Sequence, residues 1–220
     1  MLVKTLIVKF ILDEPVKGTA SKIRGFVARQ YDEYILLHHH LGQFLLFRYP
    51  LIQYKMIEGI PIIVGLNKGA DILQKIYWDL NFFFIGDEKV QIREKILILR
   101  SDDYGSNSQF NDYYFLTPWL ALNEKNYEKY QKLGTWERRK ELLASILVGN
   151  IISMSKGLGY TVPEILKVEI KSIREMPVKL KDIPMLSFVG NFSVNFEIPD
   201  YWGIGKSVSR GFGTVKKCSS

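Results

Sequence analysis

The sequence predicts an α+β protein made of two similar units in tandem, residues 1–103 and 112–220. Most of the 220 residues fall in extended apolar or alternating segments, which are typical of strands. Segments with apolar residues at helical spacing are fewer, and they separate those strands. A short, polar, turn-rich stretch over residues 102–111 lies in the middle of the chain, where two compact units would join.

The first unit begins with a predicted strand over residues 2–12, a segment rich in β-branched and large apolar residues. A helix follows, with Thr19 as its candidate N-cap. Lys22 and Arg29 lie seven residues apart and therefore share the polar face of this helix. The apolar face predicted from helical spacing comprises Ala20, Ile23, Phe26 and Val27.

The remaining elements of the first unit continue the alternation of strands and helices. Residues 33–41 and 42–66 are predicted to be extended segments with tight turns. Residues 69–80 carry one apolar helical stripe, and residues 89–100 are extended again. The predicted order is therefore β-α-β-β-α-β, which is the ferredoxin-like (RRM-like) arrangement.

The second unit is predicted to repeat this order without its second helix. The first predicted element is a strand that starts at Tyr113 and ends near Pro118. A short helix, a long helix and two alternating strands follow: 123–133, 135–157, 165–173 and 186–198. The long helix ends at Gly157, and the last of these strands is predicted to be half-exposed. Only 12 residues separate Ile198 from Gly211. A C-terminal glycine-rich loop therefore takes the place of a second helix, before a short final strand over residues 211–217.

The net charge indicates the class of partner, and the number of cysteines indicates the cellular setting. The chain has 30 Lys and Arg against 23 Asp and Glu, which gives a net charge of +7. This balance favours polyanionic partners such as nucleic acid or an anionic membrane surface. The single cysteine, Cys218, excludes an internal disulfide and a zinc finger and fits a reducing, cytoplasmic setting. Lys4 and Lys9 interrupt the apolar start of the chain, so we expect neither a spanning helix nor a signal peptide there.

The stretch YWGIGKSVSRGFGTVKK, residues 201–217, is the strongest candidate for a phosphate-binding loop. Its glycines would let the backbone approach a ligand and expose N–H donors, while its basic and hydroxyl side chains add charge and further donors. The candidate binding residues are Gly203, Gly205, Lys206, Ser207, Ser209, Arg210, Gly211 and Gly213. These features fit the sugar-phosphate backbone of a nucleic acid. A glycine-rich turn with incidental charge is the alternative.

Two other phosphate motifs do not fit this loop. A dinucleotide fingerprint needs a third glycine where this chain has Val208, and it must open a helix, whereas this loop precedes a strand. A P-loop needs a glycine at the position of Asp200. No helix follows the loop that would direct its N-terminus at a nucleotide phosphate.

All three histidines of the chain are consecutive: His38, His39 and His40. In an extended segment, His38 and His40 would share one face and His39 would take the other. A metal would need an acidic third ligand, and no carboxylate lies at a telling spacing, so we predict neither a metal nor another cofactor. Because histidine titrates near ~6.5, one ring could accept a proton while the other donates one. Three solvated histidines are the alternative.

Other residues close in sequence would complete such a site. Cleaving RNA without a metal requires a base for the 2′-hydroxyl, an acid for the departing 5′-oxygen and a cation for the phosphorane charge. Arg48 and Lys55 are nearby cations, and Tyr49 and Tyr54 could donate a proton or position the RNA. Tyr49 is therefore the third candidate catalytic residue beside the two histidines.

Three segments resemble one protein family. GIGKSVSRGFGTV resembles the C-terminal glycine-rich loop of the CRISPR repeat-processing endoribonucleases, which are members of the RAMP superfamily. LLHHHLGQF, followed by FRYPLIQYK, resembles the histidine segment of one branch of that family, and TPWLALNEKNYEKY is similar to the same branch. The pattern G-x-G-x5-G-x-G before a final strand is the most specific of these signals. With the tandem ferredoxin-like prediction, the resemblance covers almost the whole chain.

The resemblance implies metal-independent cleavage of the repeat in a long CRISPR transcript, without a cofactor. The 2′-hydroxyl would attack its own phosphodiester and leave a 2′,3′-cyclic phosphate and a 5′-hydroxyl. The glycine-rich loop would hold the repeat RNA together with basic residues of the first unit, namely Lys22, Arg29, Arg48 and Lys55. Many members of the family carry a catalytic histidine in or just after the first helix. Residues 19–31 contain none, so the catalytic assignment rests on His38 and His40.

Two alternatives to this function stay open. A non-catalytic RAMP subunit that coats guide RNA inside a CRISPR effector complex would need the fold and the basic loop but no paired histidines. A general single-strand RNA binder would use exposed aromatic side chains and show no defined cut. The expected partner is CRISPR repeat RNA in the cytoplasm. Association with an effector complex or as a homodimer stays open, and no membrane partner is expected.

Overall fold

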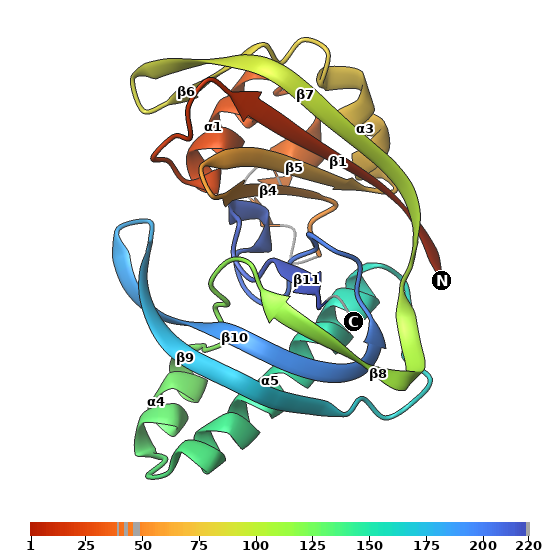
Figure 1. Ribbon diagram of the computed structural model, residues 1–220, viewed down its shortest axis with the longest axis vertical. Helices are drawn as coiled ribbons and strands as arrows, with labels where there is room; N and C mark the ends of the chain where they lie inside the picture. Colours follow the sequence, from red (N-terminus) through yellow and green to blue (C-terminus); the bar gives the residue numbers. More distant parts are fainter. Residues whose placement is uncertain (39, 42–43, 46–48, 219–220) are drawn as a thin grey trace. The chain divides into compact units, whose positions relative to one another are not determined.

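The computed structural model of the chain describes residues 1–38, 40–41, 44–45 and 49–218 (Figure 1). The chain forms two compact units. The N-terminal unit comprises Leu2–Asp102 together with Val208–Gly211, and the C-terminal unit comprises Met1, Asp103–Ser207 and the residues from Phe212 onward. Among the described residues, no helix is both long and apolar enough to cross a membrane.

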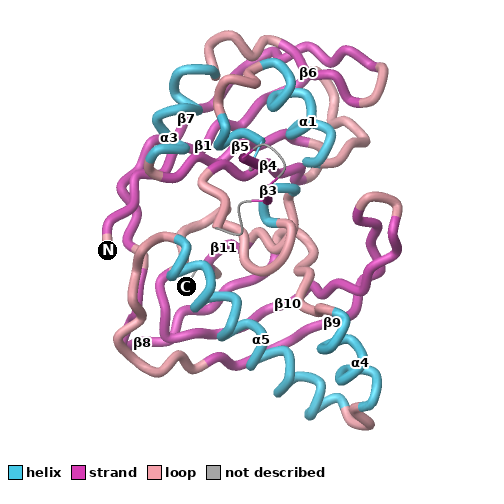
Figure 2. Tube along the Cα trace, turned by 180° about the vertical axis from the view of Figure 1, so that it is seen from behind, coloured by secondary structure: helices cyan, strands magenta, loops and turns pink. Residues whose placement is uncertain are grey.

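The N-terminal unit is built on a five-stranded sheet with the order β4-β5-β1-β7-β6. Helices α1 and α3 pack against one face of this sheet, as Figures 1 and 2 show from opposite sides. A two-stranded sheet, β2-β3, lies outside it. The elements are β1 (Leu2–Leu12), α1 (Ala20–Gln30), α2 (Ile35–His38), β2 (His40–Leu41), β3 (Phe44–Leu45), β4 (Ile52–Ile57), β5 (Ile60–Leu66), α3 (Lys68–Ile76), β6 (Phe82–Ile85) and β7 (Glu88–Asp103).

The core of the N-terminal unit follows from the side-chain periodicities of its elements. Alternate residues of β1, including Leu6, Val8 and Phe10, point to the same face of the sheet. The buried side chains of α1, including Ile23 and Val27, meet them in one hydrophobic cluster. This packing fixes α1 on the sheet and leaves its polar face free to carry the basic residues.

The C-terminal unit is built on a four-stranded sheet with the order β11-β8-β10-β9, in which neighbouring strands are antiparallel. Helices α4 and α5 lie on one face of it (Figures 1 and 2). Both helices begin with a side-chain N-cap, from Asn123 and Thr135 respectively. The elements are β8 (Gly105–Phe115), α4 (Glu124–Lys132), α5 (Trp136–Gly157), β9 (Val168–Leu180), β10 (Ile183–Glu197) and β11 (Val215–Lys217).

The predicted fold class is confirmed: α+β, with two tandem ferredoxin-like units. Each unit has the predicted strand-helix-strand-strand order, and β10 reaches β11 through the glycine-rich loop. In that loop, which the structure describes completely, the only helical element is the single 3₁₀ turn η1 (Val208–Arg210). The prediction that the second unit lacks its second helix is therefore also confirmed.

The histidine segment is not one extended run, and this part of the prediction is wrong. Ile35–His38 forms the short helix α2, and only from His40 does the chain become a strand. The backbone N–H of Leu37 donates to the carbonyl of Tyr34 at 3.0 Å, and the Leu37 side chain is buried. A short apolar run has the same pattern in a buried helix as in a buried strand, so periodicity could not separate the two.

Two further predictions about polar segments are wrong. Residues 105–111 belong to strand β8, not to a turn, because polar side chains such as Asn111 find partners within the sheet. The Asn111 side-chain amide donates to the carbonyl of Phe196 at 3.2 Å. Strand β10 is not half-exposed, since Ser193 and Asn195 on its polar face are buried as well. The Ser193 hydroxyl donates to the carboxylate of Asp112. The backbone N–H of Lys167 donates to the side-chain oxygen of Asn195.

Candidate nucleic-acid interface

The glycine-rich loop, residues 203–213, has a shape fixed by backbone hydrogen bonds. Gly203 forms an isolated β-bridge with Thr214. The backbone N–H of Ile204 donates to the carbonyl of Gly213, and the N–H of Gly213 donates to the carbonyl of Pro118, each at 2.8 Å. The two ends of the loop are therefore joined to each other and tied to the segment after β8.

Three of the glycines are required by packing inside the protein. Gly205, Gly211 and Gly213 all have positive φ, at 93°, 93° and 65°. A Cβ would lie 2.6 Å from the Trp119 indole nitrogen at Gly205, 2.6 Å from the Ala20 Cβ at Gly211, and 1.9 Å from the Ile204 carbonyl oxygen at Gly213. The close approach expected of these glycines is thus made to protein atoms. Contact between their backbone and RNA stays a prediction.

Replacing Gly213 by alanine is expected to destabilise the protein by at least about 2 kcal/mol. The new Cβ would clash with a backbone oxygen that cannot rotate away, and a left-handed φ is unfavourable for alanine. Urea denaturation followed by circular dichroism measures the change in the free energy of unfolding.

Gly149→Ala is the matched control for this substitution. Gly149 lies inside α5, and a Cβ there meets nothing within 4 Å. Alanine at an open helical position is expected to stabilise by about 0.5–1 kcal/mol. Equal unfolding midpoints for Gly213→Ala and the parent protein would show that the loop is not held as described.

Lys206 is the exposed residue of the loop, and Ser207 beside it is half-buried. The Lys206 ammonium donates to the carbonyl of Leu122 at 2.9 Å, and its backbone N–H donates to the carbonyl of Leu120 at 3.3 Å. Partial burial lowers the pKa of Lys206. An ammonium has three donors, so this lysine can fix the loop and still face a phosphate. Ser207 has a left-handed φ of 56°, and it is followed by η1, which carries Ser209 and Arg210.

Turn η1 belongs to the N-terminal unit, where it packs against β4 and α1. This placement brings Arg210 of the loop close enough to Arg24 of α1 for the two charges to interact. Burial is the main cause that lowers the pKa of Arg24, and the positive charge of Arg210 lowers it further. Because arginine stays protonated, the two guanidinium groups repel each other, and an anion bound beside them would relieve that repulsion.

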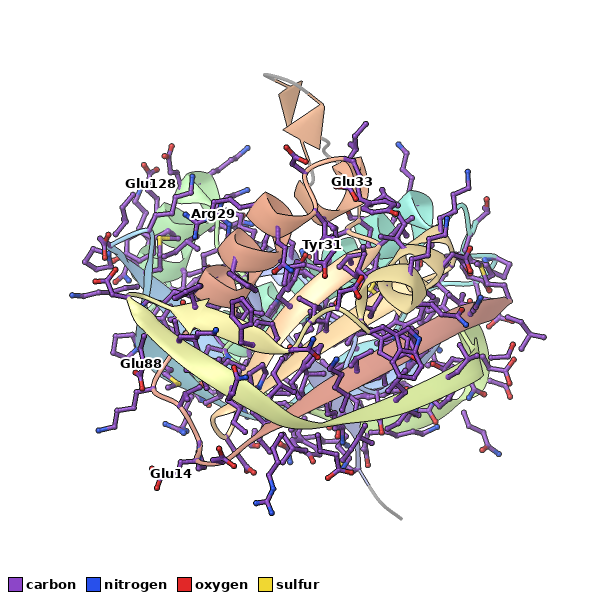
Figure 3. All side chains as sticks on the ribbon, turned by 90° about the horizontal axis from the view of Figure 1, so that it is seen from above. Glu14, Arg29, Tyr31, Glu33, Glu88 and Glu128 are labelled. Atoms are coloured by element: carbon purple, nitrogen blue, oxygen red, sulfur yellow. The ribbon has the colours of Figure 1, made fainter. Side chains whose placement is uncertain are left out.

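Arg24 also lines a surface pocket together with Lys22 and Arg29, all from α1. The pocket has a volume of about 460 Å³. Lys22 and Arg29 are exposed, and among the described residues neither forms an ion pair. Arg29, labelled in Figure 3, uses its Nε to donate to the carbonyl of Gly25 at 3.1 Å. The structure thus gathers two residues expected to bind RNA, Lys22 and Arg29, around one cavity.

Lys55 does not fit its expected contact with RNA. Its side chain lies in the interior with no exposed surface, and its ammonium donates to the side-chain oxygen of Gln53 at 3.0 Å. Burial lowers the pKa of Lys55 to about 7. Tyr54 is buried as well, and burial raises its pKa. Neither side chain reaches a surface at which it could touch a bound strand, because the first four residues of β4 are all buried.

The predicted catalytic residues fall largely outside the described part of the structure. The backbone places His38 at the end of α2 and His40 at the start of β2, whereas their side chains, His39 and Arg48 lie outside the described residues. Tyr49 is half-buried. The catalytic assignment therefore stays a prediction, and the argument from strand alternation no longer supports it. Within the described part of the chain, no group of three His, Cys, Asp or Glu side chains is placed to hold a metal ion.

Arg24 is the basic residue that sequence reasoning missed. It lies two positions after Lys22, and on a helix this spacing points the two side chains in different directions. The pocket nevertheless includes both because Phe84 of β6 and Gly86 in the turn after it line the same space beside α1. Helical periodicity alone carried no signal for this enclosure, since it depends on where a segment about 60 residues later packs.

Comparisons with known proteins agree over both units. The sequence model of the Cas6b N-terminal domain matches residues 1–103, and that of the Cas6b C-terminal domain matches residues 105–218. The uncharacterized protein MJ0978 of Methanocaldococcus jannaschii is 48% identical over 117 residues, which are 53% of this chain and 79% of that protein.

Solved structures extend this similarity to the whole fold. A crystal structure of Cas6b is 38% identical with a TM-score of 0.92, and it covers 99% of this chain and 100% of its own. A crystal structure of the CRISPR RNA processing endoribonuclease Cas6b is 36% identical with a TM-score of 0.78, at the same coverage. A RAMP protein that binds different RNA substrates, at 14% identity, a TM-score of 0.58 and full coverage of both chains, shares the fold. Since the two domain models together span almost every residue, the chain belongs to the Cas6b family.

Proposed function

We propose that this chain is an endoribonuclease that cleaves the repeat of a CRISPR precursor transcript to give guide RNAs, without a metal ion. The observation that carries the proposal is the match to Cas6b over both domains, with 36% identity over 99% of the chain to a CRISPR RNA processing endoribonuclease. The basic surface at α1 and η1 supports it, because an RNA substrate needs cations along its backbone. The net charge of +7 agrees with a polyanionic substrate.

The proposed reaction is an internal transesterification. One histidine of the pair His38 and His40 removes the proton of a ribose 2′-hydroxyl, and the 2′-oxygen forms a bond to the adjacent phosphorus. The bond from phosphorus to the 5′-oxygen breaks, and the other histidine gives a proton to that oxygen. The products are a 2′,3′-cyclic phosphate and a 5′-hydroxyl. Tyr49, which follows the histidine segment, positions the reacting phosphodiester or donates a proton to it.

The substrate is held by the sugar-phosphate backbone. Arg24 and Arg210 offer a site for a phosphate because their two positive charges lie close enough to interact. In the sequence, the glycine-rich loop carries further donors close to Arg210, namely its serine hydroxyls and the remaining donors of Lys206. Backbone contacts of this kind set the position of a strand, and base contacts then select its sequence.

Incubating the purified chain with its CRISPR repeat RNA in excess EDTA tests the proposal. We expect one defined cut, a product whose 3′ end resists phosphatase until acid opens a cyclic phosphate, and a downstream fragment that polynucleotide kinase can label directly. A strict requirement for added divalent metal would overturn the metal-independent mechanism. Tight binding of repeat RNA with no cut under any condition would overturn the endoribonuclease and favour an RNA-coating RAMP subunit.

A further inference from the structure

The pocket beside α1 contains an aromatic side chain as well as its three cations. Phe84 of β6 lines the pocket and is 40% exposed, an unusual position for a phenylalanine beside a cluster of basic residues. Its ring is held in place by Phe26 and Phe82, at centroid distances of 5.9 and 5.6 Å. Because this ring is fixed by its neighbours, a base that stacks on it would cost little additional ordering.

Two glycines keep the pocket open. Gly25 is exposed in the middle of α1, and a Cβ built there would meet nothing within 4 Å. Glycine at such a position costs about 0.5–1 kcal/mol of stability relative to alanine. Gly86, in the turn between β6 and β7, has a φ of 74°, and a Cβ there would lie 3.6 Å from the Lys22 ammonium. Neither glycine carries a side chain that would fill the space between the helix and the hairpin.

The charges around the pocket favour an anionic ligand. Lys22, Arg24 and Arg29 contribute three positive charges, and none of the residues that line the pocket is acidic. Asp87 follows Gly86 in the turn but does not line the cavity. Lysine is depleted in protein–protein interfaces, whereas cations combined with an exposed aromatic ring are typical of single-stranded nucleic acid sites. The volume of about 460 Å³ lies within the range of small-molecule sites and suits one unstacked nucleotide.

We infer that this pocket binds one unpaired nucleotide of the RNA, with the base stacked on Phe84 and its flanking phosphates contacted by Lys22 and Arg29. The inference rests on the proposed function for the identity of the RNA. Unpaired bases can be splayed out and stacked on aromatic side chains, whereas bases within a duplex cannot. The pocket therefore selects single-stranded RNA over double-stranded RNA and grips a part of the repeat that is not in a stem.

Two variants test the pocket without removing a charge. Gly25→Leu fills the cavity, and Phe84→Ala removes the stacking surface. Their matched controls are Gly149→Leu, an open glycine in α5, and Phe110→Ala, a phenylalanine of β8 that is 51% exposed. Thermal denaturation checks that each variant is folded. Phe84→Ala also removes packing between aromatic rings, whereas Gly25→Leu removes none, because a Cβ at Gly25 has open space around it. A loss of binding shared by both variants is therefore due to the pocket and not to lost packing.

Binding is measured by fluorescence anisotropy with a labelled eight-nucleotide oligoadenylate RNA and with a twelve-base-pair RNA duplex. We expect Gly25→Leu and Phe84→Ala to bind oligoadenylate roughly 5- to 150-fold more weakly, the range of one base–aromatic stack. Their duplex affinity should stay within about twofold of the parent protein. Unchanged oligoadenylate affinity in both folded variants, or an equal loss for the duplex, would overturn the pocket as a single-strand site.

The salt dependence tests the phosphate contacts separately. Replacing both Lys22 and Arg29 by alanine should reduce the slope of log affinity against log salt for oligoadenylate by about 1.4, since each contact to a single strand contributes about 0.7. An unaltered slope would contradict those contacts.

The pocket and the proposed function can fail independently of each other. If the pocket variants bind oligoadenylate normally and still cut repeat RNA at a defined site, the binding role of the pocket is overturned and the endoribonuclease stands. Pocket-dependent oligoadenylate binding by a parent chain that never cuts would sink the endoribonuclease alone.

Discussion

Replacing both His38 and His40 by alanine is expected to slow repeat cleavage by about 100- to 10,000-fold in a single-turnover assay. General acid–base catalysis contributes a factor of this size, and the double variant would lack both groups that move the proton. The single variants should each lose much of that factor, because groups that act as a unit are not additive. The chain has only one further histidine, so no distant imidazole can replace the pair.

Retained RNA affinity is the control that gives this result its meaning. The double variant should bind uncleaved repeat RNA within about twofold of the parent chain, because the basic residues of α1 and η1 are unchanged. His39→Ala is the matched single variant within the same segment, and a loss of cleavage as large as that of the double variant would move the acid–base role to His39. A double variant that cuts normally would remove the histidines from the mechanism. A loss of cleavage equal to the loss of affinity would show that the histidines bind the RNA and do not transfer its protons.

The strand and helix pattern was predictable because most elements have a clear period. The segment that became β1 is rich in β-branched residues, and α5 has an apolar stripe that ends at a glycine. Prediction failed in segments whose backbone conformation depends on tertiary partners and not on the local pattern of side chains. The α2 segment is apolar except for His38 and packs beside α1, and in β8 the side-chain amide of Asn111 donates to a carbonyl of a strand some 85 residues later. Such partners cannot be read from local composition.

The candidate interface was predictable in its residue types but not in its grouping. Lys22 and Arg29 follow from helical periodicity, and the loop cations follow from their setting among glycines. The nearness of Arg210 to Arg24 depends on how η1 packs against α1 and β4, which is a tertiary contact. The glycines were expected to approach a ligand, but at Gly205 and Gly213 protein atoms occupy the adjacent space. Local sequence shows that a glycine is present, not what lies beside it.

Lys55 is where the sequence pattern misled most, and it gives the prediction with the largest effect on stability. Gln53 and Lys55 alternate with apolar residues in β4, a pattern that normally marks a solvated face. Instead both side chains are fully buried. Among the described residues, the Lys55 ammonium donates one side-chain hydrogen bond, to the Gln53 oxygen at 3.0 Å. One neutral partner does not replace the hydration of a charge, so the folded protein favours the uncharged amine.

This burial makes the stability of the protein depend on pH in a defined direction. The pKa of Lys55 falls from 10.5 to about 7 on folding. Between these two values the unfolded chain binds the proton and the folded chain does not, so the free energy of unfolding rises with pH. Below pH 7 both states are protonated, and the full cost of the buried charge is present. One pKa unit corresponds to about 1.4 kcal/mol, so the cost is at most about 5 kcal/mol.

Lys55→Met is therefore expected to stabilise the protein by several kcal/mol at pH 6 and by much less at pH 10. Methionine fills a similar volume without a charge, and a buried charge is often replaced by an apolar side chain at no loss of stability. Urea denaturation at four pH values from 6 to 10 should give a flatter curve for this variant than for the parent. Lys75→Met, an exposed lysine of α3, is the control and should leave the pH dependence unchanged. Parallel curves for Lys55→Met and the parent would show that Lys55 keeps its proton, and hence its access to water, in the folded protein.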